Sequence, residues 1–263
     1  MPTSRGFSLI EILISLLLSS MLVLLLLNNL NTLSLYTIHT LKKMSAEDNA
    51  ISALLLLSHQ FRTAAIRECA SVDPNVNPAL LAKHPELRNP HAYKVLELDD
   101  PLITAWHLKS TRIPKGNPLA RPLLVQHLLN TFYVNTDTPE ITTATGFKAE
   151  VGSIVLVDDC EHAWISRIST VNHIPGKKNT ITIEGFDLAN FKTPFSISHL
   201  SSRMYYLGQT THSTSPAALF RSDGQKREEL LPELKALHFT ETDKQLEIQV
   251  TPEGSQEVYY ATP

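Results

Sequence analysis

The stretch that decides the fold is Arg5–Leu27, RGFSLIEILISLLLSSMLVLLLL, near the N-terminus of a chain of 263 residues. From Phe7 onward it contains no glycine or proline and a single charged side chain, Glu11. A helix rises about 1.5 Å per residue, so residues 7–27 span roughly 32 Å, close to the hydrocarbon thickness of a bilayer. The sequence therefore predicts a membrane-spanning helix over residues 7–27.

A cleaved secretory signal peptide is the first alternative for this apolar run. Such a peptide has a shorter apolar region and then a small-residue cleavage site of the A-x-A type. The residues after Leu27 are NNLNTLSLY, which contain no such site. Arg5 precedes the run and the next basic residue is Lys42, so the positive charge favours an N-terminus in the cytoplasm. We expect a single-pass protein with the bulk of the chain on the other side of the membrane.

The helix is expected to continue past the membrane. No proline or glycine occurs between Phe7 and Asp73, and Pro74 supplies a stop. Residues 28–73 are therefore predicted as an amphipathic half-helix. Its apolar face is expected to hold Leu41, Met44, Ile51, Leu54, Leu55, Phe61 and Ala65. A coiled coil or a two-helix hairpin is the alternative, although the apolar spacing is not a regular heptad.

The sequence pattern changes after Pro74 to loops and strands. Eight prolines between Pro74 and Pro122 exclude long regular elements from that segment. Strand candidates follow at residues 153–157, 164–168 and 181–184, and in the segments RMYYLG and AALFRSD. KALHFTET and KQLEIQVTP alternate apolar and polar residues around a polar turn near Asp243, which predicts a hairpin. Residues 74–263 are thus predicted to form a β-rich globular domain.

Composition and motifs exclude several classes of function. With 23 Lys and Arg against 26 Asp and Glu, the chain lacks a basic footprint, and we expect no direct nucleic-acid binding. No phosphate-binding loop, dinucleotide-binding glycine motif or nucleophile elbow occurs. The 11 histidines show no metal-ligand spacing, and the acidic pairs Asp99–Asp100 and Asp158–Asp159 are more typical of solvated or capping loop residues than of calcium ligands. We predict no enzyme, no metal site and no cofactor.

The string RGFSLIE, Arg5–Glu11, resembles the type III signal of type IV pilins and of the pseudopilins of type II secretion. In that signal a short charged leader ends in glycine, phenylalanine follows, and the fifth residue of the apolar helix is glutamate. Gly6, Phe7 and Glu11 stand at these positions. The resemblance implies that prepilin peptidase removes leader residues 1–6 by cleavage after Gly6 and that Phe7 is N-methylated. It also implies storage in the inner membrane until the subunit joins a filament.

Two interpretations of Glu11 remain open. It is either a boundary acid whose carboxylate reaches the membrane interface, or an assembly residue, because an acid inside a membrane segment is costly and usually has a partner. Cleavage creates a new amine on Phe7, in the same subunit or in a neighbour. On the second interpretation Glu11 binds such an amine and sets the register between subunits.

Several segments of the remaining chain, IREC, VGSIVLVDDCEHAWISRIS, MYYLG, AALFRSDG and EELLPELKALHFTET, are similar to PilW-type minor pilins and their J-type minor pseudopilin relatives. This resemblance implies an α+β, pilin-like fold in which a long N-terminal helix packs on a C-terminal antiparallel β-sheet domain. In that family a cysteine that closes the long helix and a cysteine after a hydrophobic strand recur, as Cys69 and Cys160 do here. Both would lie in the oxidising periplasm, where two lone cysteines usually pair. We predict a Cys69–Cys160 disulfide; two buried free thiols are the alternative.

Three functional hypotheses follow. The leading one is a minor pilin of a type IV pilus that helps to initiate assembly or lies near the filament tip, and that ends on the cell surface. Its partners would be other minor and major pilins, prepilin peptidase and the inner-membrane assembly platform. The second hypothesis is a J-type minor pseudopilin of a type II secretion system. The third is a periplasmic enzyme or sensor domain on an uncleaved membrane anchor.

Overall fold

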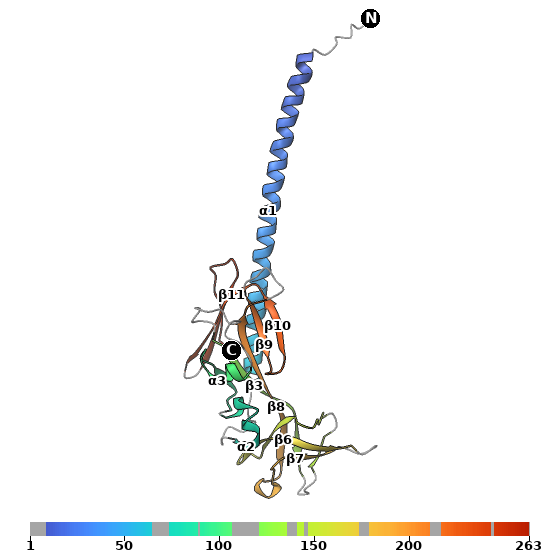
Figure 1. Cartoon of the computed structure of the whole chain (residues 1–263), viewed down its shortest axis with the longest axis vertical. Helices are drawn as coiled ribbons and strands as arrows, with labels where there is room; N and C mark the ends of the chain where they lie inside the picture. Colours follow the sequence, from blue (N-terminus) through green and yellow to red (C-terminus); the bar gives the residue numbers. More distant parts are fainter. Residues whose placement is uncertain are drawn as a thin grey trace.

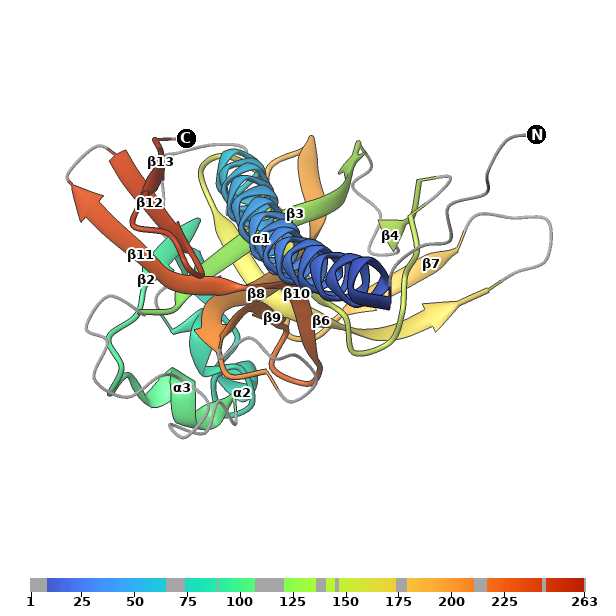
Figure 2. The same ribbon diagram turned by 90° about the horizontal axis from the view of Figure 1, so that it is seen from above.

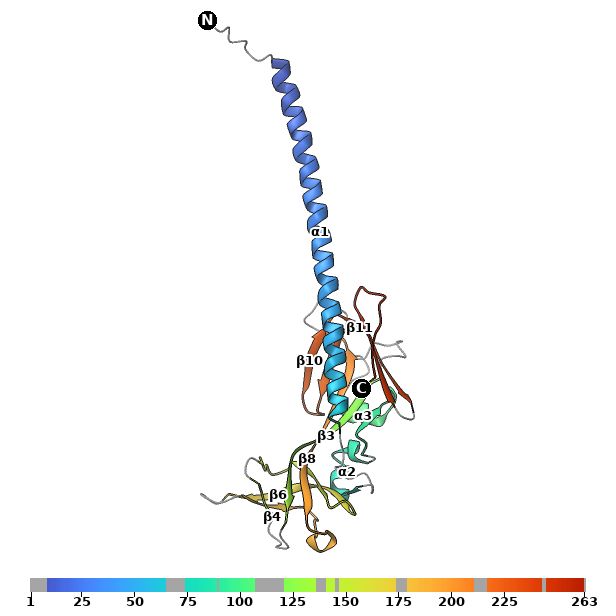
Figure 3. The same ribbon diagram turned by 180° about the vertical axis from the view of Figure 1, so that it is seen from behind.

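The computed structural model describes residues 9–64, 74–88, 90–106, 121–135, 141–144, 147–173, 179–210, 217–242 and 245–262. One helix of 54 residues, α1 (Leu9–Arg62), extends from a β-rich domain (Figure 1). At about 1.5 Å per residue, α1 is roughly 80 Å long. Its first half extends away from the domain and its last turns lie against it, as Figures 1 and 3 show from opposite sides. The predicted α+β, pilin-like architecture is confirmed.

Polar side chains in the apolar half of α1 are accommodated by the helix itself. Ser19 Oγ donates a hydrogen bond to the carbonyl of Leu16 at 3.0 Å, and Ser20 Oγ donates to Leu17 at 2.8 Å. Because each hydroxyl bonds a carbonyl one turn back, these serines can lie in an apolar environment without an unsatisfied donor.

The long helix ends earlier than the sequence predicted. We expected it to reach Asp73, but α1 ends at Arg62, and residues 65–73 lie outside the described part of the chain. The Thr63 hydroxyl bonds the carbonyls of His59 and Gln60, and the Ala64 amide bonds Phe61, three residues back. The last turn is thereby tightened and closed without a proline or a glycine.

A large sheet forms most of the domain. Its strand order is β10-β9-β8-β5-β6-β7-β4, with β3 also paired to β8, β2 to β3, and β1 to β6. Among the described strands β1–β6 is the parallel pair and the other pairs are antiparallel. The bounds are β1 Asn75–Val76, β2 Tyr93–Val95, β3 Leu123–Val134, β4 Ile141–Thr142, β5 Ile154–Asp158, β6 Ala163–Asn172, β7 Thr180–Ile183, β8 Phe195–Gly208, β9 Ala218–Ser222 and β10 Arg227–Pro232.

A second, three-stranded antiparallel sheet lies beside α1 (Figure 2). It consists of β11 (Leu234–Thr242), β12 (Gln245–Pro252) and β13 (Tyr259–Ala261). The predicted hairpin is confirmed, since β11 and β12 pair up to Thr242 opposite Gln245. The turn residues 243–244 lie outside the described part of the chain.

The described part of the proline-rich segment, residues 74–88, 90–106 and 121–122, contains short elements. Helices α2 (Pro78–Leu81) and α3 (Pro101–Ala105) each begin with proline, which has no amide hydrogen to leave unsatisfied. Asn77 caps α2 and Asp100 caps α3 by accepting hydrogen bonds from backbone amides at 3.0 and 2.9 Å. The remaining short helices are η1 (Pro85–Leu87) and η2 (Leu188–Asn190).

Strand β8 joins the upper and lower parts of the domain. It is 14 residues long, pairs with β3 along nearly its whole length, and pairs on its other edge with β5 and then with β9. The buried residues form three clusters: an upper core that includes Leu57 of α1, a lower core that includes Ile168 of β6, and a side core that includes Leu80 of α2. Phe195 and Ile197 of β8 lie in the lower core, Leu200 lies in the side core, and Tyr205 lies in the upper core. A single strand therefore contributes to all three clusters of buried residues.

The face of α1 that contacts the domain differs from the predicted one. Its buried residues are Ala46, Ala50, Ala53, Leu54 and Leu57. Of the predicted face Leu54 is buried and Phe61 is partly buried, whereas four residues are exposed: Leu41, Met44, Ile51 and Leu55. The prediction weighted large apolar side chains, but small alanines let the helix backbone approach the strands closely. Leu54 and Leu57 are buried beside the alanines, and four large side chains of the predicted face are left exposed.

Candidate functional site

The N-terminal part of α1 is an uncovered apolar surface. Gly6 and Phe7 lie outside the described residues, and Glu11 lies in the first turn of α1. The large hydrophobic side chains from Leu9 to Leu27 are each at least 50% exposed. Within the described residues α1 is a helix long and apolar enough to cross a membrane. A surface of this size needs a bilayer or other protein chains to cover it.

The uncovered surface continues past the membrane-length segment as an outer strip. Leu41, Met44, Ile51 and Leu55 are exposed by 43–67%. Their spacing of three, four or seven residues places them on one side of the helix, while the alanine-rich side faces the domain. We call these four residues the outer strip. It gives the second half of α1 an apolar side that the domain does not cover.

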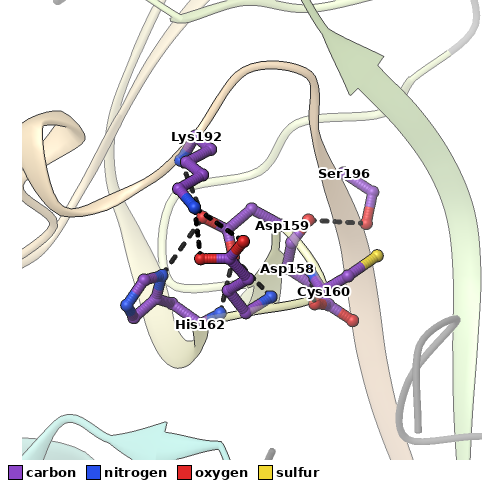
Figure 4. A network of polar contacts seen from close by, with 7 residues as sticks. Asp158, Asp159, Cys160, His162, Lys192 and Ser196 are labelled. Carbon is purple, nitrogen blue, oxygen red and sulfur yellow. Dashed lines mark hydrogen bonds and ion pairs between the residues drawn. The ribbon is translucent and has the colours of Figure 1, made fainter. Parts of the chain in front are cut away.

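The turn between β5 and β6 is held by a buried carboxylate (Figure 4). The side chain of Asp159 has no exposed surface. Its Oδ1 accepts hydrogen bonds from the amides of Glu161 and His162 at 2.9 and 2.5 Å, and its Oδ2 accepts one from the amide of Lys192 at 2.7 Å. Burial opposes ionisation, yet these N–H donors hold the pKa of Asp159 below its usual range.

Further bonds join the same turn to the start of β8. Lys192 Nζ contacts both carboxylate oxygens of Glu161 at 2.6 and 2.5 Å, and Ser196 Oγ donates to the carbonyl of Asp158 at 3.3 Å. Cys160 lies within this turn with a φ of 71°, and its amide bonds Asp158 Oδ1 at 2.8 Å. The turn that carries Cys160 is therefore fixed from two sides. Cys69, its predicted partner, lies outside the described residues.

The acidic pairs considered as cation ligands have other partners. Asp159 accepts backbone amides, and Asp100 caps α3 and lies 3.4 Å from Lys94 Nζ. Within the described chain no group of three or more His, Cys, Asp or Glu residues could hold a metal ion. These carboxylates act as caps of turns and helices.

A buried histidine that no sequence pattern indicated contacts the end of α1. His127 of β3 is buried, and its Nδ1 lies 3.2 Å from the carbonyl of Thr63. Burial lowers the pKa of His127; Arg203 and His59 lower it further, while the Thr63 carbonyl opposes the shift. The sequence around it, LLVQHLL, gave no signal because a polar residue inside an apolar run has no spacing to distinguish it.

Comparison with known proteins gives one match. Residues 1–27 match the prokaryotic N-terminal methylation motif. No curated protein and no solved structure matches the chain. The motif is the prepilin-type signal, and together with a long apolar helix packed on an antiparallel sheet it supports a type IV pilin-like protein. Such a protein is processed by prepilin peptidase and assembles with other pilins. The signal favours a structural subunit over an enzyme, and α1 fits anchoring in the inner membrane.

Proposed function

We propose that this chain is a minor pilin of a type IV pilus, a structural subunit that helps to initiate assembly or lies near the filament tip. The observation that carries the proposal is α1, whose membrane-length half and outer strip are both exposed. A bilayer covers the first half before assembly. Neighbouring subunit helices cover it, together with the outer strip, in a filament.

The shape of the domain supports a place near a filament end. Its upper part lies against α1 and its lower part, with β6 and β7, lies beyond the end of the helix (Figure 1). A domain that extends past its own helix needs space along the filament axis. That space is available where no further subunit, or a different one, lies ahead.

The processing and topology follow from the same proposal. Residues 1–6 are the leader, with cleavage after Gly6 and methylation of Phe7. Residues 7–27 span the inner membrane with the N-terminus in the cytoplasm, residues 28–73 lie in the periplasm, and residues 74–263 form the globular pilin domain. A Cys69–Cys160 disulfide joins the segment after α1 to the β5–β6 turn, and the lack of a free cysteine among the described residues supports it.

A J-type minor pseudopilin of type II secretion is the alternative, because it shares the signal, the helix and the sheet. One experiment separates the hypotheses: a C-terminally tagged chain is purified from membranes and from sheared filaments, its mass is measured, and its partners are identified. A chain without residues 1–6 among type IV pilins supports the proposal. The same chain among type II secretion subunits favours the pseudopilin. A chain that retains residues 1–6 in a piliated cell indicates a membrane-anchored enzyme or sensor.

A further inference from the structure

A pocket lies in the lower part of the domain, away from the membrane helix. It has a volume of about 310 Å³ and lies between β1, the start of β6 and the η2 segment. Figure 1 shows β6 at the end of the molecule opposite the N-terminus. We call this pocket the distal pocket. Its lining residues include Asn75, Trp164, Phe186, Asp187, Asn190 and Phe191.

Aromatic rings form one wall of the distal pocket. Phe186 and Phe191 contact each other with ring centroids 4.9 Å apart. Both also contact the buried ring of Phe195, with centroid distances of 5.9 Å for Phe186 and 6.3 Å for Phe191. The lower core therefore holds these rings in place, although both are only partly buried. Trp164 lines the pocket as well, and the β1–β6 register places it beside Asn75. The wall is a rigid aromatic surface that the fold leaves open.

Neutral hydrogen-bonding groups accompany the rings. Asn75 and Asn190 are exposed, and each carboxamide offers both a donor and an acceptor. Asp187 Oδ1 caps η2 by accepting from the Ala189 amide at 3.0 Å. The pocket thus combines apolar ring faces with groups that can both donate and accept.

The charges of the described residues around the pocket favour a neutral or cationic ligand over an anionic one. Among the described residues that line it, Asp187 is acidic, His162 is the basic side chain, and there is no Lys or Arg. The nearby cation, Lys192, is bonded to Glu161, and His162 faces Asp159 at 3.3 Å. A phosphate or carboxylate would meet the charge of Asp187, and the described basic groups nearby, Lys192 and His162, already face carboxylates. The ligand is therefore neutral or cationic.

The geometry of the aromatic rings favours a neutral ligand over a cationic one. An aromatic cage for a quaternary ammonium needs ring faces on several sides of the charge. Phe186 and Phe191 are tilted by 46° and contact each other, so a cation does not fit between these two rings, and Trp164 is the one further Phe, Tyr or Trp ring among the described residues that line the pocket. They form one platform, which suits the apolar face of a sugar ring, while carboxamides suit its hydroxyls.

We propose that the distal pocket binds a neutral saccharide, stacked on Phe191 and Phe186 and hydrogen-bonded by Asn75 and Asn190. Its volume is at the lower end of the roughly 300–1,000 Å³ of small-molecule sites, which fits one or two sugar rings. The source is either a glycan strand of the cell wall, which carries N-acetylhexosamines, or a surface glycan built from neutral hexoses. This inference goes beyond the proposed filament role and does not depend on it.

The test uses the mature full-length chain in detergent micelles. Trp106, the other tryptophan, is replaced by Phe so that Trp164 alone reports by fluorescence. The probes are chitotriose, galactose and lactose oligosaccharides, and choline. A saturable change in Trp164 emission with a saccharide is expected, and the Phe191→Leu and Asn190→Ala variants should weaken binding by about tenfold or more. Chitotriose preference indicates the cell-wall source, and hexose preference the surface source.

The control is Tyr260→Leu, which removes an exposed ring from β13, far from the pocket in sequence and sheet. It should bind as the parent chain does. Melting temperatures of all variants show whether they remain folded. A response to choline in place of saccharides overturns the proposal, as does the absence of any saturable response in the folded parent chain. Equal binding by the parent and a folded Asn190→Ala, Phe191→Leu double variant also overturns it.

Discussion

Asp159 shows at the residue scale how one side chain holds two segments together. Both of its oxygens accept backbone amides, Oδ1 from Glu161 and His162 and Oδ2 from Lys192. Asp223, in the β9–β10 turn, also accepts two amides, those of Gln225 and Lys226, but through Oδ1 alone. An amide side chain can replace one accepting oxygen and not two. Asp223 therefore serves as the control for a substitution of Asp159.

We expect Asp159→Asn to lower the free energy of unfolding by about 1–3 kcal/mol, because the Lys192 amide loses a charged acceptor whose side chain has no exposed surface. Asp223→Asn should lower it by less, because both amides keep an oxygen acceptor and only the charge of Asp223 is lost. Urea titration of both variants measures the difference. The pKa of Asp159 is lowered in the folded chain, so its ionised form stabilises the fold above its ordinary pKa. That stabilisation is lost as the pH falls through the folded value. Equal effects of the two substitutions would contradict this account.

His127 predicts a pH dependence near neutrality. Its pKa is lowered by burial and by Arg203 and His59, so the folded chain keeps the ring neutral where the unfolded chain protonates it. The free energy of unfolding should therefore fall as the pH drops below about 6.5 and level off below the folded pKa. His127→Gln should flatten this part of the profile. His173→Gln, at an exposed position, should leave it unchanged; an unchanged profile in the His127 variant would show that another group titrates.

At the scale of elements, the segment after α1 is expected to be tied to the β5–β6 turn by the Cys69–Cys160 disulfide. Closing a loop of about 90 residues stabilises a fold by roughly 4–5 kcal/mol through loop-closure entropy, less any strain. The unreduced chain should be two hydrogens lighter by mass spectrometry, and Cys160→Ser should lower the melting temperature. Alkylation of both cysteines in the unreduced, folded chain would disprove the bond.

Two adjacent leucines of α1, Leu54 and Leu55, allow the stability of the domain and the assembly of the filament to be tested separately. Leu54 is 8% exposed and packs in the upper core, whereas Leu55 is 67% exposed on the outer strip. We expect Leu54→Ala to cost about 2–5 kcal/mol of unfolding free energy. Leu55→Ala should change stability by less than about 0.5 kcal/mol but reduce the subunit in sheared filaments. Normal incorporation of the Leu55 variant would show that neighbouring subunits do not use the strip.

The sequence predicted those strands whose pattern of apolar and polar residues is regular. The β11–β12 hairpin alternates apolar and polar residues and was predicted, as were strands at β5, β6 and β7. Strand β3 was missed: its register shifts between Leu129 and Phe132, and Asn130 adopts a φ of 54°, so the alternation is broken. The distal pocket could not be predicted, because Asn75, Trp164 and Phe191 meet only through the parallel β1–β6 pair and the loop before β8.

At the scale of the whole molecule, Glu11 concerns the subunit's place among its neighbours. Residues 7 and 11 are about 6 Å apart along a helix, so a neighbour displaced by a similar distance brings its Phe7 amine to the Glu11 carboxylate. We expect Glu11→Ala to be inserted and cleaved but depleted from sheared filaments relative to membranes. Glu47→Ala, which removes an acid from the same helix beside Lys43, is the control. If both variants are equally abundant in sheared filaments, Glu11 is only a boundary acid with no role in assembly.

The strand that enters all three cores also determines how the domain bears force. β8 runs between the lower and upper parts of the molecule (Figure 1), and ten of its residues pair with β3 along that direction. A pull on the distal end, directed along the membrane helix, loads these two antiparallel strands lengthwise. Their hydrogen bonds then break together in shear, whereas a pull across the strands would open them one at a time. The domain should therefore resist axial tension far better than transverse tension.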